Sequence, residues 1–119
     1  MKICRKNALK LWEMCYGSAV YAKDFHGNLM CRDGYGNPDF YIYENGERIY
    51  CGWNLHHILP RAFGGSNAVG NLLCTNIATN EEAGDRITFW IEDSLYQVRK
   101  AEDFGYRIVE LEVGYEQHI

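Results

Sequence analysis

Near the N-terminus, apolar residues recur three and four positions apart, the spacing that places side chains on one side of an α-helix. The recurring positions are Ala8, Leu11, Trp12 and Cys15. Gly17 follows them, and glycine is common just after the last turn of a helix. The pattern predicts a helix over residues 3–16.

Turn residues divide much of the remaining chain into short segments rich in aromatic and β-branched residues, a composition typical of strands. The clearest case is a hairpin over residues 40–50, where Asn45-Gly46 supplies the positive φ angles of a type I′ turn. A second hairpin is predicted over residues 87–99, and a final strand over residues 106–113.

Residues 18–39 contain several turn signals, which separate short segments at 21–25 and 29–32. His26 lies in one of these turns, and we expect it to be exposed and structural rather than a ligand. Helical and strand segments are mixed, and no repeat, low-complexity tract or linker interrupts them. The sequence therefore predicts one α+β domain over residues 1–119.

The 119 residues suffice for one domain with a modest hydrophobic core. No apolar run approaches the ~20 residues that cross a bilayer, so we expect no contact with a membrane. The first segment, MKICRKNALK, also lacks the apolar stretch of a signal peptide. A cytoplasmic location is the resulting expectation.

Five cysteines are present, and no two of them form a Cys-x-x-Cys pair. An odd number without paired spacing argues against a disulfide framework and against a zinc site built from thiolates. We expect buried or free thiols.

The formal net charge of −4 argues against strong non-specific binding to nucleic acid, which needs an excess of Lys and Arg. A nucleic-acid site in this chain needs a local basic patch or a metal ion. The predicted N-terminal helix has one basic face, formed by Lys2, Lys6 and Lys10. That face is either a solvated helix surface or a contact for phosphate groups.

Residues 53–85 concentrate the ligand and acid–base chemistry of the chain. The predicted order is a strand at 53–59, a loop at 61–70, a strand at 71–74 and a helix at 75–85. Pro60 ends the first strand because it holds the preceding residue extended and donates no hydrogen bond. Gly64-Gly65 permits unusual backbone angles in the loop.

The spacing of polar residues in this stretch is specific. Asn71 lies fourteen positions after His57, and Asn80 lies nine positions after Asn71. The chain resembles the HNH endonuclease family, in particular its small phage and bacterial members. The residues that carry the resemblance are His56-His57-Ile58-Leu59-Pro60, Gly64-Gly65, Asn71-Leu72 and Asn80. The resemblance covers residues 53–85 and implies a ββα-metal (HNH, His-Me finger) core, with an N-terminal helix and flanking β-hairpins.

The resemblance also implies a role for each residue. His57 is the expected general base, and Asn71 is expected to fix the loop through hydrogen bonds between its amide and the backbone, which orients the base. His56 and Asn80 are the expected ligands of one divalent metal ion (Mg, Mn, Ni or Zn), with positions left for water and phosphate. Asn76, one turn before Asn80 on the predicted helix, is the alternative ligand.

These roles match what phosphodiester hydrolysis needs. A neutral imidazole can activate water, and a divalent ion can neutralise the phosphate and the leaving oxygen. Neighbouring strand residues point to opposite sides, so His56 and His57 can divide the work only if the strand begins to turn before Pro60.

The sequence departs from the family pattern at three positions. Asn80 replaces the third-letter His, a known variation that weakens metal affinity when no carboxylate compensates. His56 stands where many relatives carry Asp, and Ala83 stands where they often carry Lys. A cation for the transition state must then come from elsewhere, and Arg61 and Arg86 are the nearest in sequence. Each is either a substrate contact or a solvated side chain.

The expected function is that of a metal-dependent DNA endonuclease, a phosphodiester hydrolase with a one-metal mechanism. One alternative is a toxin or effector nuclease that acts on DNA or RNA. Another is a catalytically silent nucleic-acid-binding or structural metal module. The low positive charge indicates weak intrinsic affinity for DNA, so we expect a monomer or homodimer, alone or within a larger nuclease complex.

Overall fold

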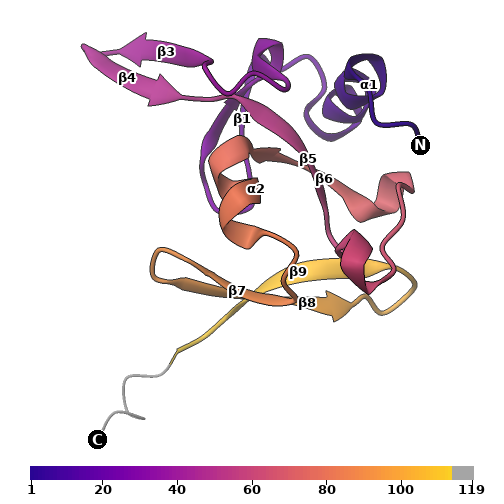
Figure 1. The fold of residues 1–119 in the computed structure, drawn as a ribbon. Coiled ribbons are helices and arrows are strands. Elements are labelled where there is room, and N and C mark those ends of the chain that lie inside the picture. Colours follow the sequence, from indigo (N-terminus) through magenta and orange to yellow (C-terminus); the bar gives the residue numbers. More distant parts are fainter. Residues whose placement is uncertain (114–119) are drawn as a thin grey trace, which may run out of the picture.

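The computed structural model describes residues 1–113, which form a mixed α+β domain with two helices and small antiparallel sheets (Figure 1). The helices are α1 (Arg5–Tyr16) and α2 (Ile77–Ala83). The strands are β1 (Tyr21–Lys23), β2 (Leu29–Cys31), β3 (Tyr41–Glu44), β4 (Glu47–Tyr50), β5 (Trp53–His57), β6 (Leu72–Asn76), β7 (Thr88–Ile91), β8 (Ser94–Lys100) and β9 (Tyr106–Leu111). The predicted α+β class is confirmed.

The strands form three two-stranded sheets (β1–β2, β3–β4 and β5–β6) and one three-stranded sheet in the order β7–β8–β9. Both predicted hairpins and the last strand are present. In the β3–β4 turn, Asn45 has φ 52° and Gly46 has φ 78°, the positive angles that a type I′ turn requires.

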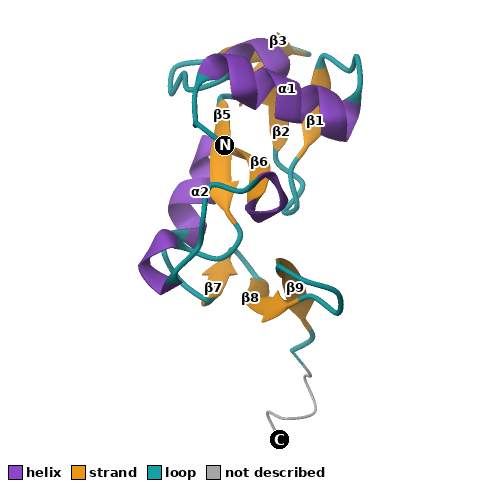
Figure 2. Ribbon diagram, turned by 90° about the vertical axis from the view of Figure 1, so that its right-hand side faces the viewer, coloured by secondary structure: helices purple, strands orange, loops and turns teal. Residues whose placement is uncertain are grey.

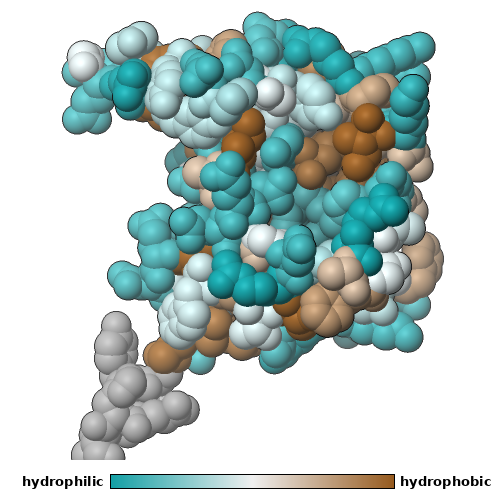
Figure 3. Space-filling view, in the orientation of Figure 1, coloured by the Kyte–Doolittle hydropathy of each residue, from teal (hydrophilic) through white to brown (hydrophobic). Residues whose placement is uncertain are grey.

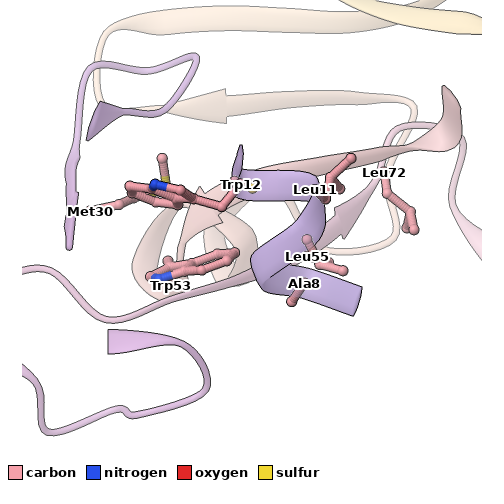
Figure 4. Close-up of a cluster of buried hydrophobic side chains, with 8 residues drawn as sticks. Ala8, Leu11, Trp12, Met30, Trp53, Leu55 and Leu72 are labelled. Atoms are coloured by element: carbon pink, nitrogen blue, oxygen red, sulfur yellow. The ribbon is translucent and has the colours of Figure 1, made fainter. Parts of the chain in front are cut away.

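Helix α1 begins two residues later than predicted and ends where expected, and it packs one face onto β5 and β6. Its side chains Ala8, Leu11 and Trp12 are buried. They join a first hydrophobic core with Met30, Trp53, Leu55, Leu72 and Cys74 (Figure 4). The ring centroids of Trp12 and Trp53 are 4.9 Å apart, so two large aromatic side chains fix the position of α1.

A second hydrophobic core fills the space between α2 and the three-stranded sheet. Its buried members are Ile58, Ala83, Phe89, Ile91, Tyr96 and Val98. Figure 2 shows α1 at one end of the molecule and the three-stranded sheet at the other, with β5, β6 and α2 between them. The segment over residues 53–85 therefore packs against the first core toward one end of the molecule and against the second core toward the other.

His26 lies in the turn between β1 and β2, but the prediction that it is exposed was wrong. Its side chain is only 10% exposed. The ring Nδ1 lies 2.7 Å from Tyr96 Oη, and Nε2 lies 3.0 Å from Glu92 Oε1. His26 thus joins the β1–β2 turn to the three-stranded sheet, a long-range contact that local turn signals do not reveal.

The β3–β4 hairpin and the three-stranded sheet extend on opposite sides of α2, and the space-filling view shows a hydrophilic hollow between them (Figure 3). The exposed side chains of α2 are Ala78, Glu81 and Glu82, so the floor of this hollow is acidic. No helix within residues 1–113 is long and apolar enough to cross a membrane. All five cysteines are free thiols, as expected.

Candidate functional site

Residues 53–85 adopt the predicted order of strand, loop, strand and helix. β5 pairs antiparallel with β6, from Trp53 opposite Asn76 to His57 opposite Leu72. β6 runs two residues further than predicted, so α2 begins at Ile77. Asn76 ends the strand and caps the helix, since its side chain accepts a hydrogen bond from Ala78 N (2.9 Å).

The chain bends before Pro60, at Ile58 and Leu59, but only after both histidines. β5 includes both His56 and His57, and the backbone ladder continues to Ile58, whose N–H donates to Asn71 O (2.9 Å). The histidines instead contact different elements. His56 contacts α2, and His57 contacts the loop between β5 and β6, which folds back to reach it.

His56 and Asn80 meet at the interface of β5 and α2. His56 is 4% exposed, and its Nδ1 lies 2.5 Å from Asn80 Oδ1. Asn80 Nδ2 donates to Asn54 Oδ1 (2.7 Å), which leaves Asn80 Oδ1 directed at the imidazole. The structure therefore brings the two predicted metal ligands together, and it adds Asn54, which no spacing rule had marked.

Burial lowers the pKa of His56. The hydrogen bond to Asn80 and the nearby Asp85 carboxylate act in the opposite direction, and the neighbouring His57 acts with burial, but desolvation is the largest effect. The imidazole is thereby kept in its neutral form, the form that can ligate a metal ion.

His57 is held by a residue that the sequence prediction missed. Its Nε2 lies 2.7 Å from Asn67 Oδ1, and Arg61 Nη1 donates to the same oxygen (3.2 Å). A guanidinium can only donate, so the shared atom is the amide oxygen and His57 Nε2 must also donate to it. The proton of the neutral ring is then on Nε2, and Nδ1 carries the lone pair that can accept a proton.

Asn71 fixes the loop backbone with its side-chain amide. Its Oδ1 accepts from Leu59 N (2.9 Å), and its Nδ2 donates to Leu59 O (3.1 Å) and Ser66 O (2.9 Å). These contacts match the expected hydrogen bonding between the amide and the backbone. The path from Asn71 to the base is indirect, because it runs through Ser66 and its neighbour Asn67.

Gly65 allows the loop to close. A Cβ at this position would lie 1.7 Å from Leu59 O, the same carbonyl that Asn71 binds. Gly64 has φ 92°, a conformation that favours glycine. Each residue of the Gly-Gly pair therefore requires glycine for a different reason: Gly64 for its positive φ, and Gly65 for its close approach to the Leu59 carbonyl.

The two candidate substrate cations lie in different places. Arg61 is beside His57 through their shared contact with Asn67. Arg86 donates to the carbonyls of Glu82 and Ala83, where it satisfies the last turn of α2. Arg61 is therefore the better placed of the two to meet a substrate near His57.

Asn76 was predicted as the alternative metal ligand, and that prediction was wrong. It is the N-cap of α2 rather than a residue on its face, and it is 3% exposed. Its Nδ2 donates to Leu29 O and Tyr50 O (2.9 and 3.2 Å). The whole amide is used to join β2, β4 and α2.

His56 and Asn80 together offer two neutral donors, fewer than the four protein ligands of a closed structural metal site. Within residues 1–113, no group of three or more His, Cys, Asp or Glu side chains is placed to hold a metal ion. Thr75 Oγ1, opposite Asn54 in the register, is buried without a hydrogen-bond partner in the described part of the chain. The face of the hairpin toward α2 thus offers neutral nitrogen and oxygen donors only, and leaves coordination positions open.

A comparison of the chain with known protein families, with curated proteins and with solved structures finds no match.

Proposed function

We propose that the chain is a metal-dependent endonuclease of the HNH type, with residues 53–85 as its ββα-metal core and DNA as its substrate. The proposal rests on the spacing of His57, Asn71 and Asn80 and on the resemblance that this spacing carries. The observation that supports it most is the state of His57. Its Nε2 donates to Asn67 Oδ1, so its Nδ1 keeps the lone pair that can accept a proton. His57 also lies in the same strand, β5, as His56.

In the proposed reaction, His57 Nδ1 removes a proton from a water molecule, and the resulting hydroxide attacks phosphorus. The P–O bond to the leaving oxygen breaks, and that oxygen takes a proton from solvent. Asn67 and Arg61 keep the imidazole in the reactive tautomer, and Asn71 keeps the loop closed around Asn67. Arg61 is placed to contact the phosphate beside His57.

His56 and Asn80 would hold the divalent ion. When bound, the ion neutralises the phosphate and the leaving oxygen. A neutral imidazole and an amide oxygen form a softer and weaker donor set than a pair of carboxylates, so we expect zinc, nickel or manganese to serve as well as magnesium. In the neutral ring His56 Nδ1 donates to Asn80 Oδ1, so ligation through Nδ1 would require the tautomer with the proton on Nε2.

The test is nicking of supercoiled plasmid with each of these ions in turn and with EDTA. We expect His57→Ala to abolish cleavage and to keep metal affinity, and His56→Ala to lose metal affinity. Matched melting curves show whether each variant folds. Equal cleavage by wild type and His57→Ala would remove the proposed base.

A second candidate is a catalytically silent nucleic-acid-binding module. The neutral donor set and the hydrogen bond that already joins His56 to Asn80 favour it. Under this alternative, the wild type binds an oligonucleotide and cleaves neither DNA nor RNA with any of the ions.

A further inference from the structure

The Asn80 side chain bridges two side chains of β5. Asn54 and His56 are two residues apart in that strand, so their side chains point to the same face, about 6.6 Å apart along the strand. The Asn80 amide reaches both from α2: its Nδ2 donates to Asn54 Oδ1 (2.7 Å), and its Oδ1 lies 2.5 Å from His56 Nδ1. Both ends of the amide are therefore held, which fixes its rotation.

This bridge consists of side-chain groups alone. Most side chains that form hydrogen bonds in a folded protein bond to backbone groups or to water. Asn76 follows that rule, since its amide bonds backbone groups of β2, β4 and α2. The chain of contacts from Asn54 through Asn80 instead ends on an imidazole, a group that can ligate a metal ion.

The amide of Asn54 has one partner in the described part of the chain. Within residues 1–113, its only side-chain hydrogen bond is the one to Asn80. Thr75, its neighbour across the hairpin, does not bond to it, and Thr75 Oγ1 has no partner among these residues. An apolar side chain would satisfy packing at this half-buried position, so the amide serves the contact with Asn80.

The contact with Asn54 decides which atom of the Asn80 amide faces His56. An amide has an accepting oxygen and a donating nitrogen, and the oxygen is the atom that ligates metal ions. Because Asn54 Oδ1 takes the Asn80 Nδ2 group, Asn80 Oδ1 is left toward the imidazole. The bond to Asn54 does not use Oδ1, so that oxygen can exchange the imidazole for an ion while the bond persists.

Orientation matters more at this site than at one rich in carboxylates. His56 and Asn80 are two neutral donors, and among residues 1–113 no group of three or more His, Cys, Asp or Glu side chains could replace them. Groups that orient metal ligands typically contribute about 10- to 100-fold to metal affinity. A misplaced Asn80 oxygen would leave the site with one donor.

We infer that Asn54 is the positioning residue of the proposed metal site: it holds the Asn80 amide with its oxygen toward His56, so that the two donors lie together before an ion binds. The inference rests on the proposed function and deepens it. In this role Asn54 acts through Asn80 and contacts neither the ion nor the phosphate.

The test is the affinity for Mn²⁺, measured from the signal of the free ion in electron paramagnetic resonance. Manganese is chosen because the free thiols of the protein prefer softer ions. Binding that remains in His56→Ala is subtracted as background. We expect Asn54→Leu, which keeps the size of the side chain, and Asn54→Ala to bind about 10- to 100-fold more weakly than wild type.

Asn54→Asp is the rescue variant. A carboxylate can only accept hydrogen bonds, so it keeps Asn80 Nδ2 in place, and its charge attracts a nearby cation. We expect it to bind Mn²⁺ at least as tightly as wild type. Asn28→Ala is the matched control, because it removes another asparagine amide that bonds α2, at Thr79 Oγ1 (2.8 Å), and it should bind Mn²⁺ as wild type does.

A second measurement separates orientation from stability. In the metal-free protein, proton–nitrogen correlation NMR shows which ring nitrogen of His56 carries the proton, and the contact with Asn80 Oδ1 places it on Nδ1. We expect Asn54→Asp to keep this tautomer and Asn54→Leu to show a mixture of both, because the Asn80 amide is then free to turn. A residue that only stabilised the fold would change the melting temperature and leave the tautomer as it is.

Four results would each overturn the inference. They are wild-type affinity or an unchanged tautomer in Asn54→Leu, a loss in Asn54→Asp equal to that in Asn54→Leu, an equal loss in Asn28→Ala, and no His56-dependent binding of Mn²⁺ by the wild type.

The outcome is separable from that of the proposed function. If the wild type nicks plasmid with manganese and Asn54→Leu binds the ion and nicks as well as it does, the nuclease stands and the inference falls. If the wild type binds Mn²⁺ through His56 without cleaving DNA or RNA and Asn54→Leu loses that binding, the inference stands and the nuclease falls.

Discussion

His57 Nε2 and Asn67 Oδ1 are 2.7 Å apart, and Arg61 donates to the same oxygen. This contact fixes the ring tautomer, because an oxygen that accepts from a guanidinium must also accept from the imidazole. It makes Asn67 the positioning residue for the proposed base.

Asn67 should control both the rate and the pH profile of cleavage. Asn67→Ala removes the acceptor and should lower plasmid nicking about 10- to 100-fold, as loss of a residue that orients a catalytic side chain does. Asn67→Asp keeps the acceptor and adds a negative charge that stabilises the protonated imidazole, so the acidic limb of the profile should move up by about one pH unit or more. A profile identical to wild type in Asn67→Asp would contradict the assignment.

Asn71 should contribute more to stability than a typical surface asparagine. Asn71→Ala leaves the Leu59 N–H, the Leu59 carbonyl and the Ser66 carbonyl without their partner, and we expect the free energy of unfolding to fall by roughly 1–3 kcal/mol. The control is Asn7→Ala, which removes one exposed hydrogen bond to Lys2 O. Urea denaturation measures both, and equal losses would show that the loop does not depend on Asn71.

The sequence predicted the elements well because their signals are local. The period of apolar residues marked α1, and Asn45-Gly46 marked the β3–β4 turn, each from a few adjacent positions. The spacing of His57, Asn71 and Asn80 likewise identified three polar residues that the structure places around β5, β6 and α2.

The missed features depend on contacts between distant residues. The burial of His26 follows from Tyr96, which lies 70 positions away. The role of Asn76 follows from backbone groups of β2 and β4, and the contact of Asn54 with Asn80 follows from the packing of α2 on β5. Helical spacing could mark Asn76 as a neighbour of Asn80. It could not show that the Asn76 side-chain amide is already hydrogen-bonded to the backbone of β2, β4 and α2.

Gly65 should tolerate no side chain, whereas Gly70 in the same loop should. A Cβ at Gly65 would lie 1.7 Å from a backbone carbonyl, whereas a Cβ at Gly70 would meet nothing within 4 Å. We expect Gly65→Ala to lower the free energy of unfolding by more than about 2 kcal/mol and Gly70→Ala to change it by less than about 0.5 kcal/mol. Thermal unfolding of the two variants checks this, and similar melting temperatures would show that the loop can shift to admit a methyl group.

The metal-free protein should lose stability in acid because of His56. Burial lowers the pKa of His56 in the folded state below the value near 6.5 of an unfolded histidine. Between the two values the unfolded chain binds more protons, so the free energy of unfolding rises with pH there. The contribution is complete above the unfolded pKa and is lost as the pH falls below it toward the folded pKa. Urea denaturation in EDTA from pH 7.5 to 5 measures the slope, which approaches roughly 1.4 kcal/mol per pH unit where the unfolded chain binds one proton more than the folded chain.

His56→Gln keeps a side chain that can hydrogen-bond Asn80 but does not titrate, so its stability should depend less on pH than that of the wild type. His26→Gln is the matched control, because it removes the other histidine that contacts a distant element and leaves His56 in place. If His56→Gln and wild type show the same slope, protonation of His56 is not what limits stability in acid, and its imidazole is not held neutral by burial.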